Sequence, residues 1–147
     1  MNSQELFTVG YEGRSIDEFV VYLNAHGIRR LIDIREIPIS RKRGFSKSSL
    51  KARLEDEKIE YLHIRSLGSP SAIRNKLKDD HDFEKFFYSY SVHLSMQTAV
   101  LREVIRLAQD GLNCLLCFER EAENCHRSAV AKRMTEISDR PFHIQHI

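Results

Sequence analysis

The chain has 147 residues, of which 41% are hydrophobic and 30% charged, and its formal net charge is +2 at pH 7. This length fits a single domain over 1–147, and the hydrophobic fraction excludes a disordered chain. No apolar run approaches the about 20 residues that a membrane-spanning helix needs. Six glycines and three prolines are too few for a turn-rich β-sandwich.

Strands and helices alternate along the first part of the chain. The apolar run 6–9 predicts a buried strand. Ser15 and Glu18 form the capping box of a helix, whose apolar residues recur at i, i+3, i+4 and i+7 and which Gly27 ends. A second strand is expected over 31–35.

A polar and basic loop follows over 40–47, and Ser46 or Ser48 then caps the next helix. A third strand is expected over 59–64. Residues 71–82 have poor periodicity and many charges, which indicates an excursion or a lid.

The second part of the chain repeats the alternation. We expect the following elements, in chain order: a helix around the aromatic residues 83–90, a longer helix over 94–109, a strand over 113–118, a helix capped by Asn124, and a strand over 142–147. The pattern predicts an α/β domain of the Rossmann-like, three-layer kind. Its sheet is open and mostly parallel, with about five strands and helices on both faces.

Three cysteines lie close together near the C-terminus, at positions 114, 117 and 125. An odd, clustered set without a secretory signal is typical of a reducing compartment, so we expect free thiols and a cytoplasmic location. Cys114 and Cys117 lie at i and i+3 on one predicted strand and therefore face opposite ways, which disfavours a zinc site. We expect no metal and no cofactor.

Parallel α/β sheets bind ligands beyond the carboxyl ends of their strands, and chemically reactive residues gather after these strands. The candidate catalytic residues, which can act as nucleophile, acid or base, are Cys125, Glu119, Asp33 and His63. The candidate ligand-binding residues, which can hold an anion or line its site, are Tyr11, Arg14, Arg35, Lys47, Cys117, His126 and Arg127.

Cys125 would be the first residue of the helix that Asn124 caps. A helix N-terminus lowers the pKa of a thiol and favours a bound anion. Three roles stay open for Cys125: a nucleophile, part of the lining of an anion site, or a buried thiol that only packs. Structural alternatives also stay open for other candidates, namely an Asp33–Arg35 ion pair, a core position for His63, and an ion pair of Arg127 with Glu119 or Asp33.

The segment 29–53 is strongly basic. It holds nine basic residues against Asp33 and Glu36, a net charge of +7, which leaves −5 for the rest of the chain. Its densest part, with the candidate nucleic-acid-binding residues Arg41, Lys42 and Arg43, follows the second strand and lies at the same sheet edge. Such a loop suits a phosphate backbone or a phosphorylated ligand, whereas the alternative is a solvated charged loop.

Short motifs along nearly the whole chain resemble the family of domain of unknown function 488. They are Thr8-Val9-Gly10-Tyr11-Glu12-x-Arg14, Asp33-x-Arg35-x-x-Pro38-x-Ser40, Phe45-Ser46-Lys47, Tyr61-x-His63, Leu67-Gly68, Cys117-x-Glu119 and Cys125-His126-Arg127-Ser128. The resemblance implies an α/β domain with a shared site at these strand ends. It implies no particular reaction.

Three functions follow as hypotheses. The first is an enzyme-like α/β protein that binds a phosphate-bearing ligand, a nucleotide or a nucleic acid, at the strand ends. The second is an accessory module without chemistry that binds nucleic acid through the basic segment 41–53. The third is a thiol-redox or zinc-binding protein.

Overall fold

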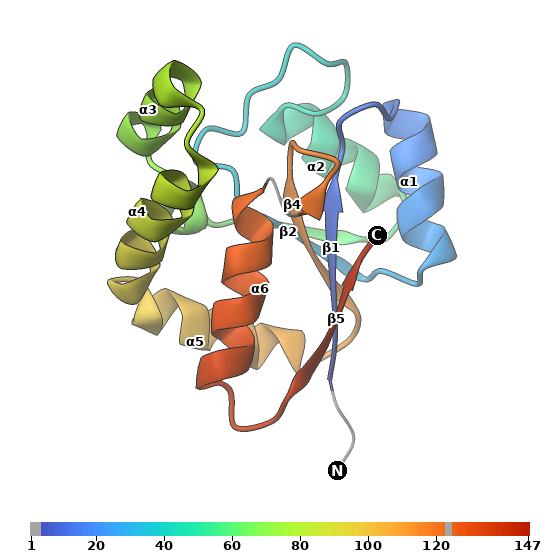
Figure 1. The fold of residues 1–147 in the computed structure, drawn as a ribbon. Helices are drawn as coiled ribbons and strands as arrows, with labels where there is room; N and C mark the ends of the chain where they lie inside the picture. The colour runs from blue at the N-terminus through green and yellow to red at the C-terminus, as the bar shows by residue number, and fades with distance from the viewer. Residues whose placement is uncertain (1–3, 123–124) are drawn as a thin grey trace.

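The computed structural model describes residues 4–122 and 125–147, and its five strands form one sheet (Figure 1). The strands are β1 (Gln4–Gly10), β2 (Arg30–Asp33), β3 (Glu60–His63), β4 (Asn113–Cys117) and β5 (Phe142–His146). Their order across the sheet is β3-β2-β4-β1-β5, and every pairing is parallel. The expected α/β class with a parallel sheet is confirmed.

Helices cover both faces of this sheet (Figure 1). They are α1 (Ile16–Ala25), α2 (Lys47–Asp56), α3 (Ser71–Asp80), α4 (Phe83–Ser95), α5 (Thr98–Ala108) and α6 (His126–Ile137), with a short 3-10 helix, η1 (Arg65–Leu67), after β3. The core accordingly has two parts. One part packs α1 and α2 against the sheet, and the other packs α4, α5 and α6 against the opposite face.

Strand β4 shows how side-chain alternation divides the core. Cys114 and Leu116 belong to the part under α1 and α2, whereas Leu115 and Cys117 belong to the part under α4, α5 and α6. Cys114 and Cys117 therefore face opposite ways, as the sequence predicts.

Local signals in the sequence set several element ends. Ser15 caps α1, since its hydroxyl accepts a hydrogen bond from the amide of Glu18 at 3.1 Å and donates one to the Glu18 carboxylate at 3.0 Å. Gly27 follows the end of α1 with a φ of 70°, a value that favours glycine. Ser15 as the N-cap and Gly27 as the stop are confirmed, whereas the Glu18 carboxylate accepts its hydrogen bond from the hydroxyl of Ser15 and not from the backbone amide that a capping box would use.

The helices between β3 and β4 differ in part from the expected elements. The segment 71–82, expected to be an excursion or a lid, contains the regular helix α3, none of whose residues is buried. The aromatic helix α4 continues to Ser95, and the next helix begins only at Thr98. On α4 itself, Phe86 and Tyr90 are buried, whereas Phe83 is exposed.

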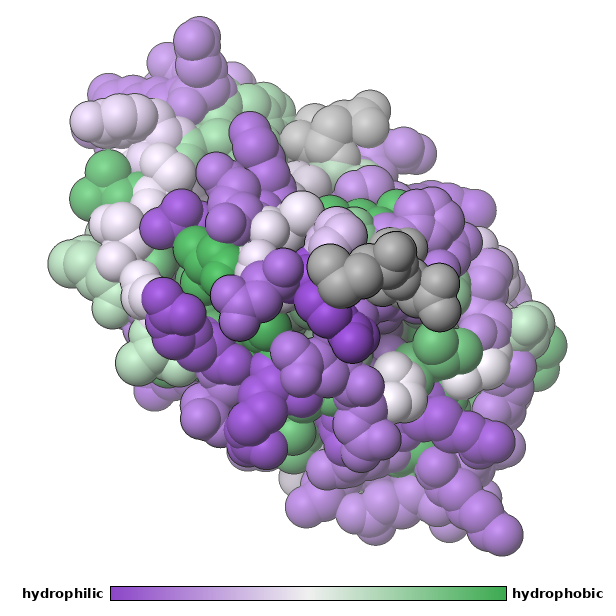
Figure 2. All heavy atoms as spheres, turned by 90° about the horizontal axis from the view of Figure 1, so that it is seen from below, coloured by the Kyte–Doolittle hydropathy of each residue, from purple (hydrophilic) through white to green (hydrophobic). Residues whose placement is uncertain are grey.

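The end of the molecule where the strands begin is mostly hydrophilic. In Figure 2 hydrophilic residues dominate this end, and apolar residues form small, separate areas. Among the helices of 4–122 and 125–147, none has the length and apolar character to cross a bilayer.

Candidate functional site

Two glycines allow the loops at the carboxyl ends of the strands to pack closely together. A Cβ atom on Gly10, the last residue of β1, would overlap the carbonyl oxygen of Glu119. A Cβ atom on Gly68 would overlap the backbone nitrogen of Glu36. The loops after β1 and β4, and those after β2 and η1, therefore come together at one edge of the sheet.

A cavity of about 490 Å³ lies at this edge. Five predicted site residues line it, namely Tyr11, Arg35, Cys117, Glu119 and His126. Its other lining residues include a polar group, Glu36, Ser69, Arg74 and Lys78, and an exposed apolar group, Ile37, Ile39 and Phe118. The cavity thus has a cationic wall and an apolar mouth.

Asp33 and Arg35 form a buried ion pair beside the cavity, which Arg35 lines. One carboxylate oxygen of Asp33 accepts from the backbone amide and Nε of Arg35, at 3.1 and 2.9 Å. The other accepts from Nη2 of Arg35 at 2.7 Å and from the hydroxyl of Tyr61 at 2.5 Å. Burial opposes the charge of Arg35, but Asp33 outweighs this effect and raises the Arg35 pKa. Asp33 is thereby committed to positioning Arg35.

Arg74 forms the cationic wall of the cavity, and the sequence patterns did not identify it. Its guanidinium donates to the carbonyl of Ser69 at 2.7 Å, to the hydroxyl of Ser71 at 3.0 Å and to Glu36 at 3.2 Å. The hydrogen bond from Ser71, together with the charge of Arg74, lowers the pKa of Glu36. Lys78, one turn further along α3, is exposed and lines the same cavity.

Glu119 also lines this cavity. Burial raises its pKa, which favours the protonated form, although the charge of Arg127 acts in the opposite direction. A carboxyl in such a setting can donate a proton to a bound ligand.

Helix α6 begins one residue later than expected. Cys125 is its N-cap, and Sγ of Cys125 accepts a hydrogen bond from the backbone amide of Arg127 at 3.5 Å. Cys125 is therefore not the first helical residue. The expected cap, Asn124, lies outside the described residues. The structure joins Cys125 to Cys117 as a disulfide, because the end of β4 and the start of α6 direct both side chains into the same part of the core. The expectation of free thiols is therefore wrong for this pair.

Cys114 is the free thiol among the three cysteines. It is fully buried on the opposite face of the sheet, and burial raises its pKa. A thiol that is buried and protonated is inert.

His126 is buried beside the disulfide. Its Nε2 lies 3.0 Å from the carbonyl oxygen of Ile34, which can only accept, so Nε2 carries the proton. Burial lowers the His126 pKa to about 4, so the ring is neutral at pH 7. The unprotonated Nδ1 faces Sγ of Cys125 at 3.8 Å.

Arg127 lies on the other side of the loop that follows β4. It is fully buried, and burial lowers its pKa. Its guanidinium donates to Thr8, to Sγ of Cys117 and to the backbone carbonyls of Glu119 and Arg120. It lines a second cavity of about 310 Å³, together with Arg14, Arg120 and His146. Arg127 and Arg14 are therefore not brought to the first cavity.

The remaining predicted residues lie outside the first cavity. His63 contacts the carbonyl of Arg35 through Nε2 at 2.7 Å. Lys42 donates to the carbonyl of Tyr11 at 3.3 Å, whereas Arg41, Arg43 and Lys47 are exposed.

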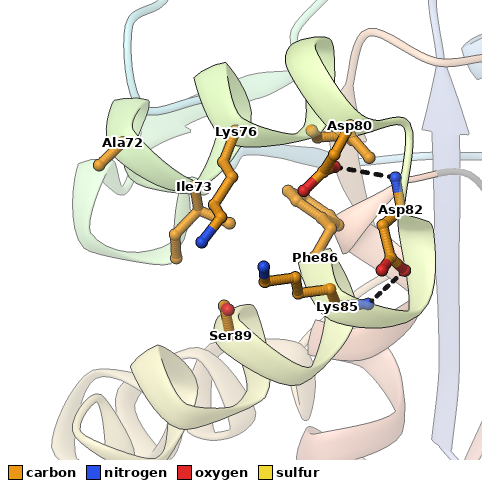
Figure 3. A pocket seen from close by; sticks show the side chains of 9 residues that line it. Ala72, Ile73, Lys76, Asp80, Asp82, Lys85, Phe86 and Ser89 are labelled. Atoms are coloured by element: carbon orange, nitrogen blue, oxygen red, sulfur yellow. Dashed lines mark hydrogen bonds between the residues drawn. The ribbon is translucent and has the colours of Figure 1, made fainter.

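A third, smaller cavity of about 200 Å³ separates α3 from α4 (Figure 3). Lys76 and Lys85 point their amino groups toward each other across it, with Ser89 beside them (Figure 3). The proximity of Lys85 lowers the pKa of Lys76. This cavity shares Leu77 and Phe86 with the larger one, and Asp80 and Asp82 line it together with the two lysines.

Comparison with known proteins gives one result. A family model described as "Domain of unknown function DUF488" matches residues 15–134. The matched range includes the motifs from Asp33 to Ser128, whereas the motif at 8–14 precedes it. No curated protein and no solved structure matches the chain.

Proposed function

The chain belongs to the DUF488 family, and we propose that it binds a phosphate-bearing ligand in the cavity at the carboxyl ends of β1, β2 and β4. The observation that carries the proposal is the composition of this cavity. Arg74 and Lys78 offer guanidinium and ammonium groups to a phosphate, while Ile37, Ile39 and Phe118 offer apolar surface to a ring.

A nucleotide suits this division of the cavity. The cavity volume of about 490 Å³ lies within the range of about 300–1,000 Å³ that small-molecule sites occupy. Helices α3 and α6 both begin beside the cavity, and neither has an acidic residue in its first turn. The positive ends of both helices add to the attraction for an anion.

If a reaction follows binding, Glu119 is the best-placed general acid in this proposal. It lines the cavity, and its raised pKa keeps it protonated at a higher pH than an exposed glutamate. The proposal includes a cytoplasmic location for the protein, where Cys117 and Cys125 would be reduced.

Calorimetric titration of the reduced protein tests the proposal, with adenosine monophosphate and inorganic phosphate as probes. We expect the nucleotide to bind more tightly, because phosphate alone leaves the apolar mouth empty. Arg74→Gln should weaken nucleotide binding about tenfold or more, since it removes a charged hydrogen-bond donor worth about 1.5–3 kcal/mol.

Two further variants provide a second test inside the cavity and a control outside it. Lys78→Gln, on the exposed side of α3, should weaken binding about threefold, equal to roughly 0.7 kcal/mol. Lys132→Gln removes an exposed lysine of α6 outside the cavity and should leave binding unchanged. The proposal fails if neither probe binds the wild-type protein, or if Lys132→Gln weakens binding as much as Lys78→Gln.

A second candidate function, nucleic-acid binding by the basic segment, is supported by the exposure of its charges. Arg30 and Arg53 are held in ion pairs, with Glu60 and with Asp17 and Glu57 respectively. The side chains of Arg41, Arg43, Lys47 and Lys51 are exposed instead, on and beside one loop.

The triple variant Arg41→Ala, Arg43→Ala, Lys47→Ala tests this second candidate and spares Lys42, which contacts Tyr11. If these residues contact duplex DNA, the slope of log affinity against log salt should become shallower by about 2.7. An unchanged slope rules out this loop as the contact.

A further inference from the structure

Two cysteine sulfurs and one imidazole meet where β4 ends and α6 begins. Sγ of Cys117, Sγ of Cys125 and a ring nitrogen of His126 lie within 4.8 Å of one another, and all three residues are buried. We propose that these three groups bind a zinc ion once the disulfide is reduced. This inference does not depend on the nucleotide proposal.

The backbone separation of the two cysteines suits an ion between their sulfurs. Their Cα atoms are 7.3 Å apart, whereas disulfide-bonded cysteines usually hold these atoms about 4.4–6.8 Å apart. Two thiolates on a tetrahedral zinc ion, with Zn–S bonds of about 2.3 Å, stand about 3.8 Å apart. Reduced side chains can take up this spacing without bringing the backbones closer.

His126 offers the third ligand in the required tautomer. Its Nε2 donates to the carbonyl of Ile34 at 3.0 Å, which leaves the lone pair of Nδ1 free to bind a metal. Nδ1 is 3.8 Å from Sγ of Cys125, close to the about 3.6 Å that a tetrahedral zinc ion sets between a sulfur and a nitrogen ligand. The hydrogen bond to Ile34 also fixes the ring orientation, as such bonds do in metal sites.

Neighbouring donors stabilise the thiolate forms that bind metal. Nη1 of Arg127 donates to Sγ of Cys117 at 3.3 Å, and the backbone amide of Arg127 donates to Sγ of Cys125 at 3.5 Å. Cys117 and His126 line the large cavity, so the fourth coordination position is accessible from it. Three protein ligands and one open position are typical of catalytic zinc sites.

Loading requires two balanced steps. A thiol reductant supplies two electrons and two protons, the bond between Cys117 and Cys125 breaks to give two thiols, and the reductant becomes a disulfide. Zinc then forms two bonds to sulfur and one to nitrogen, and the two thiol protons pass to solvent.

Metal analysis of the 147-residue chain, produced without a histidine tag, tests the proposal. The protein is reduced with a phosphine, freed of the reductant under nitrogen, and loaded with zinc sulfate in a phosphate-free buffer. We expect one zinc ion per chain after gel filtration. Cys114→Ala, the matched control, should also bind one, because Cys114 lies on the opposite face of the sheet.

Two variants remove ligands and keep the local structure. Cys125→Ser retains an N-cap for α6 but should bind no stoichiometric zinc, since a serine hydroxyl does not replace a thiolate. His126→Gln keeps a donor for Ile34 and should lower zinc affinity at least tenfold. Cobalt(II) added to the reduced wild-type protein should give a thiolate-to-cobalt charge-transfer band, a readout that depends on no variant.

The proposal is overturned if reduced wild-type protein binds no stoichiometric zinc, if cobalt gives no thiolate band, or if Cys125→Ser binds zinc like the wild type. A protein that binds zinc but no adenosine monophosphate keeps this inference and loses the proposed function. A protein that binds the nucleotide but no zinc gives the opposite result.

Discussion

Two buried polar corners, one at Asp33 and Arg35 and the other at His126 and Cys125, adjoin the cavity, and they differ in how completely their atoms are hydrogen-bonded. Each carboxylate oxygen of Asp33 accepts two hydrogen bonds, and Arg35 also donates to the carbonyl of Phe45 at 2.7 Å. At the other corner, Nδ1 of His126 contacts the sulfur of Cys125 and has no other hydrogen-bond partner among residues 4–122 and 125–147. The corner at Asp33 maintains the shape of the sheet edge, whereas the corner at His126 retains the capacity to bind.

Asp33→Asn tests the structural corner and should have the largest effect. The asparagine leaves the buried guanidinium of Arg35 without its counter-charge, which costs about 3–5 kcal/mol of unfolding free energy. Urea unfolding followed by circular dichroism measures this loss. Asp17→Asn is the control, since Asp17 pairs with Arg53 at the surface and should cost less than about 1 kcal/mol. Equal losses in the two variants would contradict the structural role of Asp33.

Gly10→Ala tests whether close loop packing holds the two corners together. The added methyl group overlaps the carbonyl of Glu119, so the loop after β4 must move, at a cost of about 2–3 kcal/mol. Gly13→Ala should cost about 1 kcal/mol, because its φ of 78° disfavours alanine but its nearest neighbour is the flexible side chain of Arg120. A smaller loss for Gly10→Ala than for Gly13→Ala would show that this contact does not set the loop.

His126→Gln should have the smallest effect on stability, about 1 kcal/mol. The glutamine amide can still donate to Ile34, and the main loss is the edge contact with Tyr90, whose ring centroid is 5.2 Å away. The same unfolding assay, run on zinc-free protein, measures it. A loss as large as that of Asp33→Asn would mean that both corners are structural.

The fold follows closely from sequence patterns where the signals are local. The hydrogen bond from the Glu18 amide to the Ser15 hydroxyl, and the positive φ of Gly27, set the ends of α1 as the residues predict. Helix α3 was not predictable in this way. It packs on α4 and buries no residue, and no side-chain hydrogen bond caps its start.

The candidate site was predictable only in part. Residues that directly follow buried strands, such as Tyr11, Arg35 and Glu119, do line one cavity because parallel strands end at one edge. The position of Arg74 at this cavity depends on its hydrogen bond to Glu36. That hydrogen bond is possible because Gly68 lets the backbone at Glu36 approach closely. No periodicity encodes such a contact between distant segments.

The cysteines show a similar limit. Strand alternation correctly separates Cys114 from Cys117, and this separation disfavours a zinc site built on those two residues. The pairing of Cys117 with Cys125 depends on the path of the loop after β4. The spacing of the cysteines in the sequence does not predict this path.

An NMR titration of the reduced, ¹⁵N-labelled protein with adenosine monophosphate tests the central claim most directly. The account predicts saturable shifts of the backbone amides of Ser69, Arg74, Glu119 and His126, which surround the cavity. Shifts confined to residues 41–51, or no shifts at all, would contradict a nucleotide site at the carboxyl ends of the strands.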